Sequence, residues 1–333
     1  MRAFVTGVTG QDGSYLAELL LSKGYEVAGF IRSSSTGHLG NADHLRDQIK
    51  FYRGSLDDER SIETAIQDFQ PTEIYNLGAE AAPFDSFHRP VYTSDINALG
   101  PIRIFEAAKR LASKPRIYQA STSEMFGAPD HCPQSEKSEF KPNNPYGCAK
   151  LFAHNNARIL REGKDQMFIS CGILFNHESP RRGMQYVTRK VTVAVACIKN
   201  KVKEVPINEL GQPIITKDWR LEMGNLDAMR DWGYSPDYVM AMHLMLQQDK
   251  PDDFVIATGE THTIAELCEV AFSHAGLDWR EHVVVNPAFV RPLETGPLCG
   301  DATKALNVLG WEPSVKFREL IGIMVDHDLA TFG

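Results

Sequence analysis

Short apolar segments alternate with amphipathic segments along the first half of the chain. The apolar segments predict strands at residues 2–6, 25–31, 49–52, 73–77, 116–120 and 168–174. Helical periodicity predicts helices at 15–23, 61–69 and 99–112, and a longer helix that begins near Pro145. Strands separated by helices of this length form parallel βαβ units, so the predicted fold class is α/β, with a Rossmann-type doubly wound parallel sheet.

The pattern is less regular in the second half of the chain. A loop at 176–183 precedes a helix at 187–198, and the stretch 201–220 is interrupted by proline, glycine and charged residues. Later helices are predicted at 237–247, 264–275 and 317–328. We therefore predict a Rossmann domain at 1–175, with some later segments returning to it. Residues 176–333 should form mainly a smaller C-terminal α/β lobe over the carboxyl edge of the sheet, where α/β proteins bind substrates.

Composition narrows the class of partner. The formal net charge of the 333 residues is −8, which argues against a nucleic acid or an anionic membrane as partner. The six cysteines form no C-x-x-C pair and are typical of reduced thiols in a cytoplasmic protein. The sequence contains neither a signal-peptide pattern nor an apolar run long enough to span a bilayer. We expect a cytoplasmic protein that is neither processed nor inserted in a membrane.

Three glycines join the first predicted strand to the first predicted helix. Gly7, Gly10 and Gly13 permit a tight turn that brings a pyrophosphate close to the helix N-terminus. Their spacing is G-x-x-G-x-x-G, and a simple tight loop is the alternative interpretation. The strand-turn-helix context favours a dinucleotide site. The turn residues predicted to bind the cofactor are Gly7, Thr9, Gly10, Gln11, Asp12 and Gly13.

The next strands suggest which dinucleotide binds. An acid that would select NAD is absent after the second strand, where Arg32 is followed by three serines. An arginine with hydroxyls suits a 2′-phosphate, so NADP is the predicted cofactor, although a solvated surface arginine is the alternative. Ser55 and Leu56 follow the third strand and could flank the adenine. Leu77 and Ala79 follow the fourth, where small residues leave room for a cofactor.

Tyr146 and Lys150 lie four residues apart and would share one face of the long helix. A lysine beside a phenol stabilises the phenolate, so Tyr146 could take a hydroxyl proton while a hydride leaves the same carbon. Such a spacing also occurs by chance at the start of an amphipathic helix. The order of the glycine turn and this pair along the chain favours the catalytic interpretation.

Thr122 and Glu124 follow the strand at 116–120, at the carboxyl edge of the predicted sheet. Thr122 would bind the O4 atom of a sugar, and Glu124 could remove the C5 proton once C4 is a ketone. The same acid could protonate the departing C6 hydroxyl. A capping box is the alternative role, but Gly127 and Pro129 follow too soon for a long helix. An acid beside a hydride-transfer pair predicts a dehydratase that uses internal redox chemistry.

The chain resembles the GDP-mannose 4,6-dehydratases of the extended short-chain dehydrogenase/reductase family. The resemblance covers nearly the whole chain and rests on residues 6–21, 118–127, 145–151, 172–190, 224–239, 257–260 and 291–294. It implies NADP-dependent conversion of a GDP-hexose to its 4-keto-6-deoxy form by a homodimer or homotetramer, with no metal. The implied catalytic residues are Thr122, Glu124, Tyr146 and Lys150. The resemblance adds His177 and Arg182 to the cofactor site, and it implies that Ser123, Asn176, Lys190, Arg230, Arg291 and Glu294 bind the nucleotide sugar.

Several segments depart from the family pattern. Arg32-Ser33 replaces two arginines, residues 79–84 lack the usual polar side chains, and Asn143-Asn144 replaces Arg-Ser. An insertion of about ten residues falls between Val205 and Lys217, a length typical of a functional loop. Small residues at 81–82 would widen the pocket near the hexose. GDP-manno-heptose is therefore an alternative substrate to GDP-mannose.

Two other classes of function compete with the dehydratase. A GDP-sugar epimerase or reductase on the same fold does not require Glu124 beside Thr122. A protein that only senses NADP would not require Tyr146, Lys150 and Glu124 together.

Overall fold

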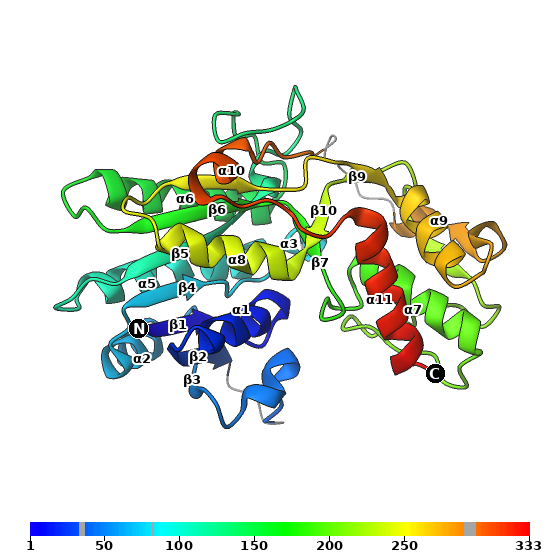
Figure 1. Cartoon of the computed structure of the whole chain (residues 1–333), viewed down its shortest axis with the longest axis horizontal. Helices are drawn as coiled ribbons and strands as arrows, with labels where there is room; N and C mark the ends of the chain where they lie inside the picture. Colours follow the sequence, from blue (N-terminus) through cyan, green and yellow to red (C-terminus); the bar gives the residue numbers. More distant parts are fainter. Residues whose placement is uncertain (33–36, 82, 290–297) are drawn as a thin grey trace.

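The computed structural model describes residues 1–32, 37–81, 83–289 and 298–333, and it is built around a seven-stranded sheet (Figure 1). Neighbouring strands pair in parallel, in the order β11-β6-β5-β4-β1-β2-β3. The strands are β1 Arg2–Thr6, β2 Glu26–Arg32, β3 Lys50–Gly54, β4 Glu73–Asn76, β5 Arg116–Thr122, β6 Ile169–Leu174 and β11 Asp253–Ile256. The order reverses between β1 and β4, so the predicted Rossmann-type doubly wound sheet is confirmed.

Helices cover both faces of the sheet. On one face α1 (Gln11–Ser22) packs against α8 (Ser235–Leu246), and their apolar side chains share a core with β1 and β2. On the other face α2 (Glu59–Phe69) and α5 (Gly100–Lys109) pack together, and α6 (Pro145–Glu162) lies against β5 and β6. Because α8 and β11 belong to the sheet domain, the second half of the chain returns to it after residue 176.

A smaller lobe lies beside the sheet (Figure 1). Its helices α7 (Val187–Asn200), α9 (Ile264–His274) and α11 (Phe317–Thr331) pack on one another around a separate apolar core. Three short strand pairs complete it. They join β7 (Asn176–Glu178) to β10 (Trp232–Tyr234), β9 (Met229–Arg230) to β12 (His262–Thr263), and β8 (Leu221–Met223) to β13 (Val283–Val285).

Short helices connect the larger elements. They are η1 Gly40–Leu45, α3 Pro83–Ser86, α4 Pro90–Ser94, the π-helical turn η2 Asp95–Leu99, η3 Ser123–Met125, η4 Trp279–Glu281, η5 Pro287–Phe289 and α10 Thr303–Leu309. Among the described residues, no helix combines the length and the apolar character needed to cross a membrane.

Several predicted boundaries are wrong. The first helix begins at Gln11 and not at residue 15, because its first turn is built from polar residues and glycine that carry no apolar periodicity. The helix predicted at 99–112 begins at Gly100 and continues the π-helical turn η2. Within that turn, the Asn97 side chain accepts a hydrogen bond from the Glu80 N–H and donates one to the Glu80 carbonyl oxygen. The predicted loop 176–183 contains β7. Leu77 lies beyond the end of β4.

Candidate active site

The turn between β1 and α1 is shaped by close backbone contacts. Gly7 has a φ of 70°, and a Cβ atom there would lie 2.9 Å from the backbone nitrogen of Gly78. A Cβ atom on Gly13 would lie 2.3 Å from the carbonyl oxygen of Gly7. Gly10 is exposed and is the N-cap of α1, so the cap residue has no side chain that could accept a hydrogen bond from the first-turn N–H groups. These donors are therefore left for an anion at the carboxyl edge of the sheet.

The side chains of Gln11 and Asp12 in that first turn contact the loop after β6. The Asp12 carboxylate accepts hydrogen bonds from His177 Nε2 and from the Ser235 hydroxyl, each at 2.8 Å. Gln11 donates to the His177 carbonyl oxygen and accepts from the Ser179 hydroxyl. Burial raises the pKa of Asp12, but the charge and hydrogen bond of His177 outweigh it and lower that pKa to about 2. The two side chains and His177 thus join the sheet domain to the lobe.

Three side chains on successive turns of α6 contact the end of β5. The buried Tyr146 hydroxyl is hydrogen-bonded to Thr122. Lys150 Nζ donates to the Ala120 carbonyl oxygen at 3.0 Å and lies 5.8 Å from the centroid of the Tyr146 ring. One turn further, His154 Nδ1 is 3.0 Å from the Ser121 hydroxyl. The helix therefore fixes Thr122, Tyr146 and Lys150 relative to one another.

Burial changes the titration of this pair. It lowers the pKa of Lys150 to about 8, and it raises the pKa of Tyr146 well above its usual value, although the Thr122 hydrogen bond acts in the opposite direction. Burial disfavours the charged form of each group. At pH 7 Tyr146 is therefore neutral, whereas Lys150 still carries its positive charge, because its pKa of about 8 lies above 7. A further positive charge brought by a ligand would lower the pKa of Tyr146.

Glu124 is buried beside this pair, in the short helix η3. Its carboxylate accepts a hydrogen bond of 2.8 Å from the Asn144 side-chain amide, whose oxygen caps α6 by accepting from the Gly147 N–H. Thr122, and not Glu124, caps η3, because the Thr122 hydroxyl accepts from the Glu124 N–H. The carboxylate of Glu124 is therefore not used in a capping box. The structure brings together the four residues predicted for catalysis.

Residues predicted beside the rest of the cofactor end the neighbouring strands. Arg32 is the exposed last residue of β2, and the serines that follow it lie outside the described residues. The Leu56 side chain packs near Gly78, and its carbonyl oxygen accepts a hydrogen bond from Arg103. Leu77 and Ala79 flank Gly78 in the segment after β4, and Ser55 follows β3. The adjacent strand ends thus lie along one edge of the sheet.

In the lobe, Lys190 lines a cavity of about 230 Å³. Its Nζ atom donates to the Glu222 carbonyl oxygen at 2.7 Å and lies 4.5 Å from the centroid of the Phe289 ring. Burial lowers the pKa of Lys190. The other residues of the cavity wall are Gln212, Pro213, Ile214, Ile215, Thr216, Arg220, Glu222 and Phe289. The sequence prediction missed Arg220 and Phe289, which are brought to Lys190 only by folding of the lobe.

The other residues predicted for substrate binding are dispersed. Ser123 is buried in η3 next to Thr122 and Glu124. Asn176 begins β7, and the buried Arg230 ends β9. Arg291 and Glu294 lie outside the described residues.

Arg182 lies close to the catalytic pair. It is paired with the buried Glu178 at 3.1 Å, and its guanidinium carbon stacks 3.7 Å from the centroid of the Tyr186 ring. The charges of Arg182 and Tyr186 both act on the pKa of Tyr146. Arg182 and Tyr186 are therefore within electrostatic range of Tyr146. Tyr186, like Asn144, was not predicted as a site residue.

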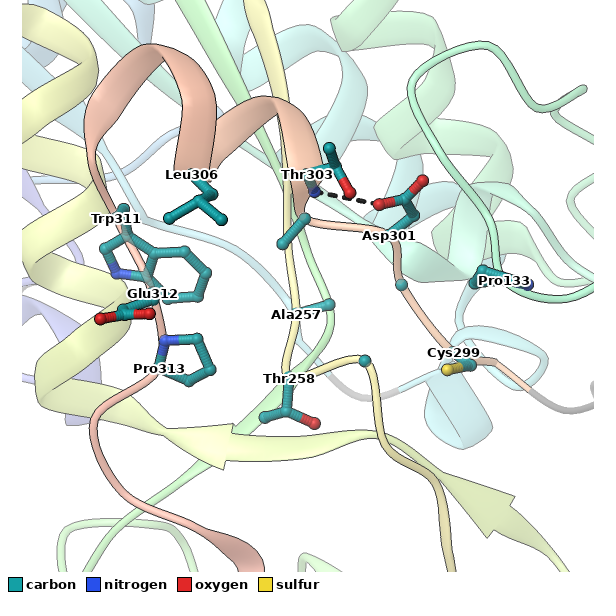
Figure 2. A pocket seen from close by; sticks show the side chains of 13 residues that line it. Pro133, Ala257, Thr258, Cys299, Asp301, Thr303, Leu306, Trp311, Glu312 and Pro313 are labelled. Carbon is teal, nitrogen blue, oxygen red and sulfur yellow. Dashed lines mark hydrogen bonds between the residues drawn. The ribbon is translucent and has the colours of Figure 1, made fainter.

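A larger cavity, of about 380 Å³, lies near α10 (Figure 2). Figure 2 shows Trp311, Pro313 and Leu306 on one side of it and Cys299 and Pro133 on the other, with Asp301 bonded to the Thr303 N–H. None of its lining residues belongs to the predicted site. The candidate active site is therefore the group around Tyr146 and not this cavity.

Comparison with solved structures agrees with the fold. The fold is shared with UDP-glucose 4-epimerase from Thermus thermophilus in complex with NAD, at a TM-score of 0.83 and 24% identity over 98% of this chain and 99% of that one. It is also shared with RMD from Pseudomonas aeruginosa complexed with NADPH, at a TM-score of 0.79 and 20% identity over 99% of each chain.

Similarity in sequence is more specific. GDP-mannose 4,6 dehydratase 1 from Arabidopsis thaliana is 43% identical over 339 aligned residues, which span 98% of this chain and 89% of that protein. The sequence model of the family described as GDP-mannose 4,6 dehydratase matches residues 4–324. The chain therefore belongs to the GDP-mannose 4,6-dehydratase family.

Proposed function

We propose that this protein is an NADP-dependent lyase that converts GDP-D-mannose to GDP-4-keto-6-deoxy-D-mannose. The observation that carries the proposal is the burial of Glu124 beside the Thr122–Tyr146 pair. Oxidation at C4 requires only a base for the hydroxyl proton. Elimination of water across C5 and C6 requires a second group that moves a carbon-bound proton, and Glu124 supplies it. A 4-epimerase that works by hydride transfer, or a reductase that only reduces a ketone, moves no carbon-bound proton and does not require this second group.

The first turn of α1 fits the diphosphate of a dinucleotide. The exposed Gly10, the uncapped N–H groups and the backbone contacts of Gly7 and Gly13 leave room and donors for phosphate oxygens. Arg32 at the end of β2 supports the choice of NADP, because a guanidinium pairs with a 2′-phosphate. When bound, the nicotinamide would accept the C4 hydride and later return it to C6. His177 and Arg182 approach the site from the loop after β6.

Tyr146 acts as the base for the C4 hydroxyl in this proposal. Thr122 holds both the Tyr146 hydroxyl and the sugar O4, and the positive charge of Lys150 stabilises the phenolate. Burial of the pair excludes water, which would otherwise compete for the proton.

Glu124 acts in the second stage. Once C4 is a ketone, the C5 proton is acidic and passes to the Glu124 carboxylate. The same proton then goes to the C6 hydroxyl, which departs as water. When C6 is reduced, C5 takes up one proton, which balances the proton that Tyr146 removed from the C4 hydroxyl. Asn144 orients the carboxylate through its amide and leaves the second carboxylate oxygen for this transfer.

The lobe would bind the nucleotide part of the substrate. Lys190 and Arg220 bring positive charge to the cavity of about 230 Å³, and Phe289 offers an aromatic face on which a base can stack. Arg230, Asn176 and Ser123 would contact the sugar diphosphate between this cavity and Tyr146. Arg291 and Glu294 keep the predicted substrate role.

The assembly is proposed to be a homodimer or a homotetramer. Apolar side chains are exposed along the helices from α3 to α6: Phe84 (44%), Val91 (83%), Leu99 (46%), Phe152 (47%) and Ile159 (60%). A second copy of the chain would remove this surface from water. All six cysteines are free thiols, four of them buried, which supports the proposed location in a reducing cytoplasm.

The test is a product analysis by mass spectrometry. The protein is incubated with NADP and either GDP-mannose or GDP-manno-heptose, and the loss of one water is scored together with the absorbance of NADPH. We expect GDP-mannose to lose one water with no net formation of NADPH. Stoichiometric formation of NADPH without loss of water would favour a reductase that acts in reverse on the C4 hydroxyl, and an isomeric product of unchanged mass would favour an epimerase.

A further inference from the structure

Tyr186 joins the lobe to the segment that follows β4. It is the N-cap residue of α7, and its hydroxyl donates a hydrogen bond of 2.9 Å to the carbonyl oxygen of Ala81. Ala81 lies in the segment 79–84, which contains the small residues that distinguish this chain. The Arg182 guanidinium stacks on the Tyr186 ring. The ring is therefore fixed at its hydroxyl and on one face.

The loop that carries Tyr186 is held by the segment Val205–Lys217. The two carboxylate oxygens of Glu209 accept hydrogen bonds from the Met184 and Gln185 N–H groups, each at 3.0 Å. These donors precede α7, whose first turn contains no acid, so Glu209 supplies negative charge at its N-terminus.

The turn at Glu209 is itself ordered. The Asn208 side chain accepts hydrogen bonds from the Leu210 and Gln212 N–H groups, and Gln212 reaches the wall of the cavity that contains Lys190. One segment thus supports both the loop with Tyr186 and that cavity.

Tyr186 is also near the reacting end of the site. The carbonyl oxygen that it bonds belongs to the segment after β4, and β4 pairs with β5, which ends at Thr122. The charge of Tyr186, like that of Arg182, also acts on the pKa of Tyr146. The Tyr146 hydroxyl must reach the C4 hydroxyl of the sugar, so groups next to it lie within the length of one sugar ring. The ring of Tyr186 therefore borders the space that the hexose must occupy.

We propose that Tyr186 is a specificity-determining residue, whose ring forms the wall of the sugar pocket opposite Tyr146 and is fixed by Ala81 and by the loop bound to Glu209. This inference rests on the proposed function. The small side chain of Ala81 does not by itself open the pocket, because the phenol of Tyr186 reaches across to the Ala81 carbonyl oxygen.

The first test isolates binding of the sugar from binding of the nucleotide. Dissociation constants for GDP and GDP-mannose are measured by calorimetry with the NADPH-loaded protein, in which no hydride can be accepted. The dissociation constant of GDP divided by that of GDP-mannose gives the contribution of the sugar to binding. Tyr186→Phe, which loses only the bond to Ala81, should lower this ratio about fivefold. Tyr186→Ala should lower it about tenfold or more, because the wall itself is lost. The affinity for GDP should change less than about twofold in both variants.

Tyr52→Phe is the matched control, since it also removes one phenolic hydroxyl. Tyr52 lies on β3, and its hydroxyl is bonded to Asp68 on α2. In Tyr52→Phe the ratio of the two dissociation constants should equal that of the parent. An unchanged ratio in Tyr186→Ala would overturn the proposal. So would an equal loss of affinity for GDP and for GDP-mannose, which indicates general damage to the loop.

The second test uses turnover. Tyr186→Ala should shift the ratio of kcat/KM towards GDP-manno-heptose over GDP-mannose by about tenfold. A shift below twofold in this ratio would contradict a role in sugar selection. A parent protein that binds GDP-mannose with a measurable sugar contribution but releases no water would refute the proposed function, and the binding ratios would still test Tyr186.

Discussion

The Asn144 side-chain amide lies 2.8 Å from the Glu124 carboxylate, and the oxygen of the same amide caps α6. One side chain thus sets the start of the helix that carries Tyr146 and orients the acid that faces it. A Cβ atom on Gly147 would lie 2.6 Å from the Glu124 carbonyl oxygen, so the helix and η3 approach closely. The acid and the phenol are positioned by the same contact between η3 and α6.

Glu124→Gln should separate the two stages of the proposed reaction. Glutamine keeps the shape of the side chain and can still bond Asn144, but it cannot accept the C5 proton. The rate of water loss should fall about a hundredfold or more. Reduction of bound NADP by GDP-mannose, followed by absorbance in a single turnover, should persist. Glu139→Gln, an exposed carboxylate paired with Lys141, is the control. Equal rates of water loss in variant and parent would exclude Glu124 as the acid and base.

The two roles of Asn144, which orients Glu124 and caps α6, can be tested separately. Asn144→Ser retains a side chain that caps helices but loses the amide that reaches Glu124. The free energy of unfolding of the variant should lie within about 0.5 kcal/mol of that of the parent, while the rate of water loss falls about tenfold. Asn144→Ala should show the same slower reaction and lose about 1 kcal/mol in the free energy of unfolding. A fully active Asn144→Ser enzyme would show that the amide does not position Glu124.

Asp12 should make the stability of the protein depend on pH. Its pKa of about 2 in the folded protein is below the usual value of 3.8, so the ionised form stabilises the fold above pH 3.8. This contribution, about 2 kcal/mol, is lost as the pH falls through 2. In urea unfolding at pH 5, the free energy of unfolding of Asp12→Asn should therefore be about 2 kcal/mol lower than that of the parent. This difference should shrink towards pH 3. Asp249→Asn, on the surface, is the control. A difference that stayed constant down to pH 3 would contradict the pairing with His177.

The sequence predicted the order of the elements that carry strong periodicity. The strand Arg2–Thr6 has the predicted ends, and the α7 and α9 helices begin where expected. The strand Asp253–Ile256 and the helix Thr303–Leu309 were not predicted. Both are short, and their stability comes from packing on the sheet domain, which local periodicity does not record.

The candidate site also contains residues that the sequence predicts and contacts that it does not. Thr122, Glu124, Tyr146 and Lys150 were found because they follow a strand or share a helix face. The bond from Tyr186 to Ala81 joins residues 105 positions apart, and no spacing rule indicates it. The side chains of Gln11 and Asp12 were predicted at the cofactor, but they bond Ser179, His177 and Ser235. Their N–H groups remain the part of the turn that suits a phosphate.

The central claim, that one site oxidises, dehydrates and reduces the same sugar, is tested most directly with GDP-mannose that carries deuterium at C4. The reaction is run with unlabelled NADP, and the product is analysed by mass spectrometry and NMR. We expect a product one water lighter that carries the deuterium at C6. Deuterium found in the free cofactor, or retained at C4 of a product that has lost no water, would contradict it.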